Sequence, residues 1–89
     1  MDLTLLELAH IVPYEMVQVY NVNNGQRFET YAIPGEKGSG VVCLNGAAAR
    51  LGMAGDKVII VSTAVVDESE VHAFAPTVVF VNDQNRPAA

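Results

Sequence analysis

The stretch from Asn21 to Tyr31 constrains the fold of this chain most strongly, because its pattern is that of two strands joined by a tight turn. Asn24-Gly25 is the strongest short hairpin signal, since a type I′ turn needs positive φ at both central positions. After the turn the side chains alternate, so that Arg27 and Tyr31 point to one face and Thr30 points to the other. The sequence therefore predicts a hairpin with an arginine and a tyrosine on one strand face.

These two residue types suit the chemistry of a small carboxylic acid. Arginine holds a carboxylate through two parallel hydrogen bonds. Tyrosine can donate a proton in a reaction. A solvated Arg27 beside a half-buried core Tyr31 is the alternative, and on the strand pattern alone it is the more frequent outcome.

Size and composition predict a single β domain over residues 1–89. Hydrophobic residues make up 51% of the chain, and fourteen residues are valine. So small a domain buries such apolar material incompletely, which favours a homo-oligomer. The net charge of −5 makes nucleic acid an improbable partner and disfavours a DNA-binding swapped-hairpin protein of similar size.

No segment of the sequence suggests membrane insertion or export. The apolar run 58–66 contains Ser62 and Thr63 and is too short to span a bilayer. The first residues carry no basic region of the kind that opens a signal peptide. A single cysteine, Cys43, excludes an internal disulfide. The expectation is a cytoplasmic, soluble oligomer.

The remaining pattern predicts a mostly β chain with short helical turns. A helix is expected over 2–9, opened by a capping box between Thr4 and Glu7. Strands are expected over 16–22, 41–44, 57–66 and 77–81, with 57–66 central and 41–44 buried. The acidic residues 67–70 open a helical turn through 73, and together with His10 and His72 they suggest no metal site. The tail 86–89 is expected to be frayed and disordered.

Small residues follow the predicted strand 41–44. Gly46 and the alanines after it would let a ligand approach the backbone closely, and helix-start amides can donate to a carboxylate. A strand-to-helix packing corner is the alternative, and by itself the commoner one. The glycine-rich loop 34–40 does not match a phosphate-binding loop, and it is expected to be a mobile connection.

Two longer stretches resemble the signature stretches of the aspartate 1-decarboxylase family. Residues 20–31 read Tyr-Asn-Val-Asn-Asn-Gly-Gln-Arg-Phe-Glu-Thr-Tyr, and residues 38–50 read Gly-Ser-Gly-Val-Val-Cys-Leu-Asn-Gly-Ala-Ala-Ala-Arg. Segments 55–60 and 76–83 match as well, so the resemblance covers nearly the whole chain. It implies a double-psi β-barrel, a tetramer with active sites between neighbouring subunits, and conversion of L-aspartate to β-alanine for pantothenate synthesis.

The resemblance also implies a cofactor and partners. The family uses a covalent pyruvoyl group, made when a Gly-Ser bond of the precursor breaks into a short β chain and a longer α chain. The substrate amine forms a Schiff base with this group. The Schiff base then accepts the electron pair that the departing CO₂ leaves on the substrate carbon.

Roles for individual residues follow from the same resemblance. Arg27 would clamp a substrate carboxylate, Tyr31 would return a proton to the carbanion carbon, and Thr30 would contact substrate and assist self-cleavage. Asn45 would hydrogen-bond near the pyruvoyl carbonyl, and Tyr20 would help to wall the pocket. Backbone contacts to substrate would come from three small residues, Gly46, Ala47 and Ala48.

One part of the family pattern has no counterpart in these 89 residues. The missing leading segment carries a lysine, a histidine, a tyrosine and the Gly-Ser cleavage point, and Met1 falls just after the serine that becomes pyruvoyl. Gly38-Ser39 is no substitute, because the resemblance puts it in a loop. A partial α chain, a misassigned start and a natural truncation are the open explanations. We favour an incomplete true decarboxylase; the alternative is a truncated, inactive oligomeric barrel that binds a small carboxylate.

Overall fold

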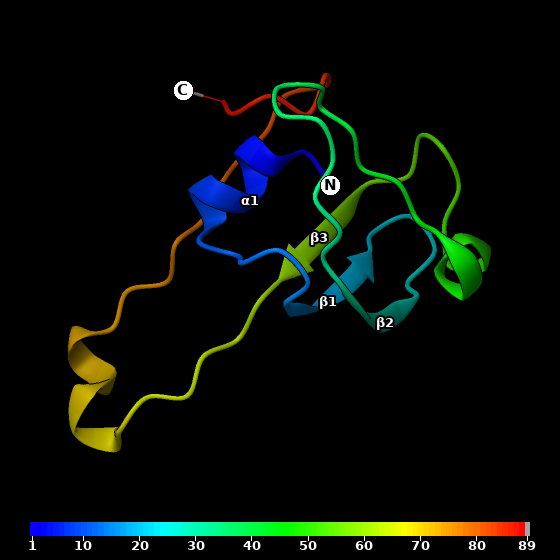
Figure 1. Ribbon diagram of the computed structural model, residues 1–89. Coiled ribbons are helices and arrows are strands. Elements are labelled where there is room, and N and C mark those ends of the chain that lie inside the picture. The colour runs from blue at the N-terminus through cyan, green and yellow to red at the C-terminus, as the bar shows by residue number, and fades with distance from the viewer. Residues whose placement is uncertain (89) are drawn as a thin grey trace.

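A three-stranded antiparallel sheet forms the centre of the computed structural model, which describes residues 1–88 (Figure 1). The strands β1 (Met16–Asn21), β2 (Arg27–Tyr31) and β3 (Val58–Val61) lie in the order β2-β1-β3. One α-helix, α1 (Leu3–Ala9), and two 3₁₀ helices, η1 (Gly46–Leu51) and η2 (Glu68–Ala73), complete the elements. The predicted class is confirmed: the fold is small and mostly β with short helical turns, as in a small β-barrel.

The hydrophobic core lies on one face of the central strand. Val17 and Val19 of β1 are 4% and 2% exposed, and Leu6 of α1 is completely buried against this face. Ile11 and Ala32 close the cluster. The alternation of buried and exposed residues along β1 is the period-2 pattern that the sequence predicts, so the opposite face of β1 is left for other contacts.

The hairpin between β1 and β2 is present, but the prediction of a type I′ turn is wrong. Five residues separate the strands, and of the pair 24–25 only Gly25 has positive φ, at 76°. The buried side chain of Asn21 instead organises the loop, because its Oδ1 accepts from the amides of Asn23 and Asn24 at 2.9 and 3.2 Å. Such a side-chain turn competes effectively with a two-residue turn.

Three strand predictions are also corrected. Residues 41–44 form no strand and are only partly buried. Residues 77–81 form no strand beyond an isolated bridge from Val81 to Pro87. The strand predicted as central, 57–66, is present only as the short β3, which lies at an edge of the sheet. The β-branched residues of these segments signal a strand, but a strand needs a neighbouring edge to pair with. Both edges of β1 are taken by β2 and β3, and within the described chain the segments 41–44 and 77–81 pair with neither outer edge of the sheet.

The chain end predicted to be disordered folds back over residues 80–82. The amide of Ala88 donates to the Phe80 carbonyl at 2.8 Å, and that of Asn82 donates to the Arg86 carbonyl at 2.9 Å. The Asn85 side chain also donates to the carbonyl of Gly40. Arg86 to Ala88 are therefore attached to the body of the chain, and the prediction for residue 89 lies outside the described residues.

The cap of α1 differs from the predicted capping box. Asp2, only 3% exposed, is the N-cap, and its Oδ1 accepts from the Thr4 amide at 2.8 Å. The same carboxylate accepts from the amides of Gly38 and Gly40 at 2.9 and 2.8 Å. The glycine-rich loop 34–40 is thus tied to the start of α1. Donation from Gly40 first, and then from Gly38 and Thr4, lowers the pKa of Asp2 below its ordinary value.

Replacing Asp2 with asparagine should lower the melting temperature at pH 7 by on the order of 5 °C, because the charge that receives three amides is lost. Since the folded-state pKa lies below the ordinary 3.8, the stabilising effect of Asp2 is present above that value and is lost as pH falls through the folded pKa. In Asp2→Asn, the melting temperature should therefore fall less steeply than in wild type as the pH is lowered. Thermal melts followed by circular dichroism at several pH values check this. Asp83→Asn, an exposed change, is the control, and an equal acid slope in Asp2→Asn and wild type would contradict the prediction.

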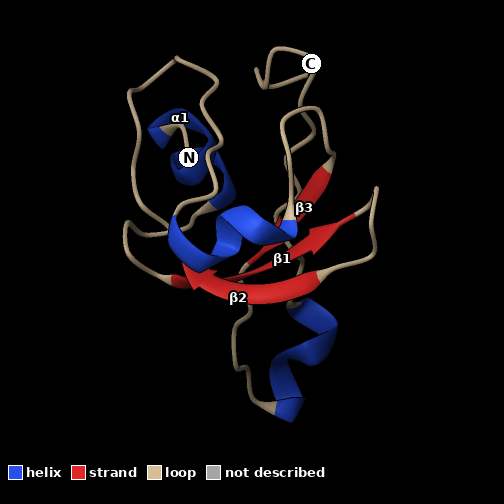
Figure 2. Cartoon of the chain, turned by 90° about the vertical axis from the view of Figure 1, so that its right-hand side faces the viewer, coloured by secondary structure: helices blue, strands red, loops and turns tan. Residues whose placement is uncertain are grey.

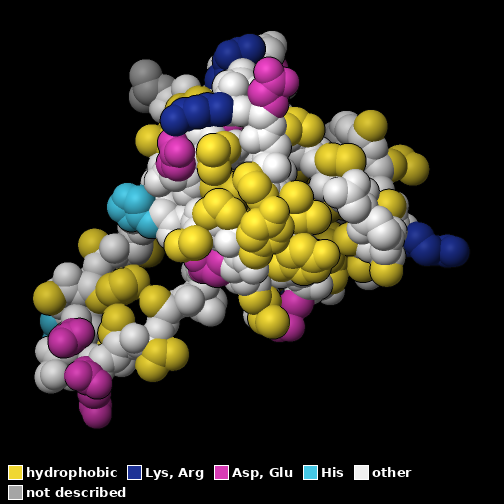
Figure 3. Space-filling view, in the orientation of Figure 1, with side chains coloured by type: hydrophobic (Ala, Val, Ile, Leu, Met, Phe, Trp, Pro, Cys, Tyr) yellow, Lys and Arg dark blue, Asp and Glu magenta, His cyan; other side chains and the backbone are white. Residues whose placement is uncertain are grey.

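An extended arm, residues 62–79, projects from the body and carries η2 at its tip (Figure 2). Its apolar side chains are exposed rather than packed, and they are scattered along the arm in Figure 3. Phe74 and Val78 are 51% and 64% exposed, and Phe80 at the arm's base is 73% exposed. Among residues 1–88, no helix has the length and apolar character needed to cross a bilayer.

Candidate active site

A cavity of about 340 Å³ lies between the end of β2 and the segment 41–48. Thr30 and Tyr31 line it from β2, and Asn45 lines it from the opposite side. Asn45 is fourteen and fifteen positions away from Tyr31 and Thr30 in the sequence, and only folding brings these side chains to one space. The remaining wall is mostly apolar and includes Val17, Val19, Val42, Leu44 and Ile60.

Small residues leave room beside Asn45, as the sequence suggests. Gly46 and Ala48 line the cavity, and Gly46 has φ of 60° at the start of η1. Ala47 is exposed and does not line it. The helical turn predicted from the alanines is confirmed as η1, although the Asn45 side chain does not cap it.

The first residue of the chain is part of the same cavity wall. The Met1 nitrogen donates to the Ile33 carbonyl at 2.8 Å, and the Gly35 amide donates to the Met1 carbonyl at 2.7 Å. A Cβ on Gly35 would lie 2.5 Å from the Val41 side chain, so this close packing needs glycine. The backbone at Met1 is thereby held against the cavity by the loop that Asp2 anchors.

Cys43 also lines the cavity, which its sequence context does not predict. Its exposed thiol donates to Asn45 Oδ1 at 3.4 Å. Since the side-chain oxygen of Asn45 accepts this bond, its amide nitrogen can donate elsewhere. No bond from that nitrogen is formed within residues 1–88.

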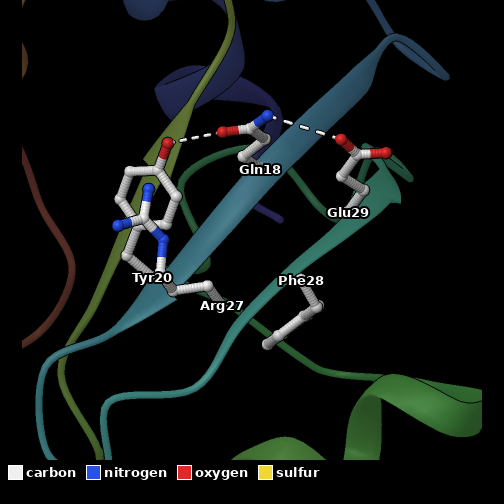
Figure 4. A pocket seen from close by; sticks show the side chains of 5 residues that line it. All are labelled: Gln18, Tyr20, Arg27, Phe28 and Glu29. Atoms are coloured by element: carbon white, nitrogen blue, oxygen red, sulfur yellow. Dashed lines mark hydrogen bonds between the residues drawn. The ribbon is translucent and has the colours of Figure 1, made fainter.

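A second, smaller hollow of about 230 Å³ lies on the face of the sheet away from the core (Figure 4). Arg27 and Tyr20 line it and stand directly opposite each other on β2 and β1. The Arg27 guanidinium lies 4.1 Å from the centre of the Tyr20 ring, within the range of a cation–π interaction.

Three residues that line this hollow, Gln18, Phe28 and Glu29, were not predicted as site residues from the sequence. The Tyr20 hydroxyl donates to Gln18 Oε1 at 2.5 Å, and Gln18 Nε2 donates to Glu29 Oε1 at 3.4 Å. The available signal was the alternation of the strands, which puts Gln18 beside Tyr20 and Glu29 beside Arg27.

The predicted site residues therefore fall into two groups within one chain. Thr30, Tyr31 and Asn45 share the large cavity, whereas Arg27 and Tyr20 share the smaller hollow. Arg27 and Tyr31 do lie on the same outward side of β2, as the alternation predicts, and Tyr31 is 57% exposed. The cavity offers hydroxyl and amide donors, and the hollow offers a cation.

The hairpin loop also supports the site. Asn21 Nδ2 donates to the Leu51 carbonyl at 3.2 Å and to Asp56 Oδ2 at 2.9 Å, which joins the loop to the end of η1. Donation from Asn21, and then from the Met53 amide, lowers the pKa of Asp56. In the described part of the chain, no cluster of three or more histidine, cysteine or acidic side chains is arranged to hold a metal ion.

Comparison with known proteins identifies the family to which this chain belongs. The family model described as aspartate decarboxylase matches residues 1–88. A protein named aspartate 1-decarboxylase from Thermoanaerobacter pseudethanolicus is 56% identical over 86 residues, covering 97% of this chain and 74% of the relative. One from Leptospira biflexa is 59% identical over 87 residues with the same coverage, and one from Syntrophobacter fumaroxidans is 57% identical over 86 residues, covering 97% and 69%. This chain belongs to the aspartate decarboxylase family of enzymes.

Proposed function

We propose that this chain supplies most of the active site of an enzyme that converts L-aspartate to β-alanine and CO₂ for pantothenate synthesis. The observation that carries the proposal is the cavity in which Thr30, Tyr31 and Asn45 meet beside the small residues Gly46 and Ala48. Relatives with 56–59% identity over 97% of the chain bear the name of this activity. The pathway is inferred from the product.

The donor set of the cavity fits a pyruvoyl group. An α-keto amide presents neighbouring carbonyl oxygens, and the cavity offers the Thr30 hydroxyl, the Tyr31 hydroxyl and the Asn45 amide nitrogen as donors. Asn45 would hold this group, together with the backbone near Met1. When bound, a pyruvoyl group supplies the electron sink for the electron pair left by the departing CO₂. In the proposed precursor, the serine just before Met1 would become this group at the head of the α chain, and the segment that precedes the serine would be the β chain.

The chain's own residues would bind the substrate and move a proton. Arg27 would pair with a substrate carboxylate through two hydrogen bonds, while the Tyr20 ring supports the guanidinium. Tyr31 would donate its hydroxyl proton to the carbon from which CO₂ has departed. Thr30 would orient the substrate and assist self-cleavage. The backbone at Gly46, Ala47 and Ala48 would approach the substrate closely because no large side chain intervenes.

We further propose that copies of the chain assemble, as a tetramer, and close the two hollows. The projecting arm and the outward side of β2 expose large apolar side chains. Monomers rarely leave so many unpacked apolar residues in water, so a neighbouring copy is the natural cover. A subunit placed there would also shield the reacting atoms from water.

Changing the apolar base of the arm should disrupt this assembly. Phe80→Glu places a charge on a side chain that is 73% exposed, and the charge would have to be buried in the interface. We expect the oligomer to dissociate at least about tenfold more readily, as measured by sedimentation velocity over a range of concentrations. Ser69→Glu adds the same charge at an exposed polar position of η2 and is the control. If Phe80→Glu sediments like wild type, the arm is not part of the interface.

The proposed function is tested on the protein made from its native gene. Release of labelled CO₂ from L-[1-¹⁴C]aspartate and formation of β-alanine are measured, together with the intact mass of the denatured chains. Turnover with a pyruvoyl mass on one chain supports the proposal. Saturable aspartate binding without CO₂ release would overturn it and would favour the inactive carboxylate-binding barrel.

A further inference from the structure

The outward face of the β1–β2 pair carries a row of contacts beside Arg27. Two directly opposed pairs make up this row, Tyr20 with Arg27 and Gln18 with Glu29. Because residues two positions apart on a strand share a face, the four side chains lie next to one another in Figure 4. The contacts run from Glu29 to Gln18, from Gln18 to Tyr20 and from Tyr20 to Arg27.

We infer that Gln18 is a positioning residue that acts through Tyr20 to hold the Arg27 guanidinium ready for a substrate carboxylate. The inference rests on the proposed function of Arg27 as the carboxylate-binding residue. It assigns to Gln18 a part in substrate affinity and none in the chemical step.

The first step of the argument is the orientation of the Tyr20 ring. A flat ring restrains a guanidinium only while its face stays turned toward it. The bond from the Tyr20 hydroxyl to Gln18 Oε1, at 2.5 Å, fixes the far end of the ring and so keeps the side chain from swinging away from Arg27. Gln18 thereby keeps the face of the ring under Arg27.

The second step is the orientation of the Gln18 amide. The Glu29 carboxylate can only accept hydrogen bonds, so Gln18 must present its NH₂ group to Glu29 and its carbonyl oxygen to Tyr20. Glu29 thus selects the amide orientation that binds the Tyr20 hydroxyl.

The third step concerns competition for Arg27. Glu29 is the nearest acidic neighbour of Arg27 along the same strand face, yet residues 1–88 contain no ion pair between them. Gln18 engages Glu29 instead, which leaves the guanidinium available for an incoming carboxylate. Without Gln18, Glu29 would be able to pair with Arg27 and to compete with the substrate.

The test compares Gln18→Ala and Tyr20→Phe with two matched controls. Gln26→Ala and Tyr14→Phe make the same chemical changes at exposed positions whose side chains form no hydrogen bond within residues 1–88. Steady-state kinetics with L-aspartate separate KM from kcat. Calorimetric titration with succinate, a dicarboxylate without the reacting amine, measures binding in the absence of turnover.

We expect both variants to raise KM and the Kd for succinate about threefold to tenfold, with kcat changed less than about twofold. The controls should match wild type. NMR gives a direct readout: the Tyr20 ring current should shift the Arg27 Hδ resonances upfield, and Gln18→Ala should move them toward random-coil values. Unchanged Arg27 shifts together with unchanged Kd in Gln18→Ala would overturn the inference.

Glu29 provides an internal check on the third step. The double variant Gln18→Ala, Glu29→Ala lacks the Glu29 carboxylate that would compete for Arg27. Its affinity for succinate should therefore recover part of the loss seen in Gln18→Ala alone. No recovery, or a further loss, would contradict the competition step.

Failure of this inference is distinguishable from failure of the proposed function. If wild type binds succinate and Arg27→Ala abolishes binding while Gln18→Ala has no effect, the function of Arg27 stands and the role of Gln18 falls. If wild type does not bind either acid, the proposed function falls, and the Arg27 resonances still decide whether Gln18 positions the guanidinium.

Discussion

Replacing Arg27 with alanine should lower kcat/KM for L-aspartate by on the order of a hundredfold or more, because the cation that pairs with the substrate carboxylate is lost. The change should leave the fold intact, since Arg27 is exposed and its guanidinium lies over the Tyr20 ring rather than in the core. Kinetics and succinate titration measure the effect, and circular dichroism checks the fold.

Two further arginine variants make this result specific. Arg27→Lys keeps the charge but cannot make two parallel hydrogen bonds, so it should fall between wild type and Arg27→Ala. Arg50→Ala removes an exposed arginine from the last turn of η1 and should behave like wild type. Full activity in Arg27→Ala would end the assignment of Arg27 as the carboxylate-binding residue.

Replacing Tyr31 with phenylalanine should lower kcat by about a hundredfold to a thousandfold while KM changes little, because the ring remains and only the proton donor is removed. Tyr31 lines the large cavity from the end of β2, beside Thr30 and across from Asn45. Rapid-quench kinetics should show that CO₂ release precedes the slowed step.

Tyr14→Phe is the matched control for this variant, since Tyr14 is an exposed tyrosine outside both hollows. It should retain wild-type kcat. If Tyr31→Phe instead loses succinate binding together with turnover, Tyr31 is a binding residue and another group donates the proton.

The strand alternation was predictable because it is a local property. Val17 and Val19 point to the core and Tyr20 points away, as the period of two requires for any half-buried strand. The same regularity put Arg27 and Tyr31 on one side of β2. The small residues after Asn45 likewise predict open space, because a missing side chain leaves room whatever the fold.

The errors arose where structure depends on distant partners. The pair 24–25 favours a two-residue turn, yet the buried Asn21 bonds across to η1 and Asp56, and that set of contacts selects a longer loop. The segments 41–44 and 77–81 have the composition of strands, but in the described chain neither segment pairs with a strand of the sheet. Asp2 displaces the predicted capping box because its carboxylate also receives two amides of the loop 34–40.

The sequence by itself determined the class of fold, the family, and which residue types stand ready for carboxylate chemistry, because these follow from composition, short-range alternation and matched motifs. Only the tertiary structure decided which of those residues meet. It put Thr30 and Tyr31 opposite Asn45 in one cavity, and it put Arg27 with Tyr20, Gln18 and Glu29 in another hollow. The physical reason is that such groupings depend on strand register and on long-range hydrogen bonds, neither of which is encoded in any single stretch of the chain.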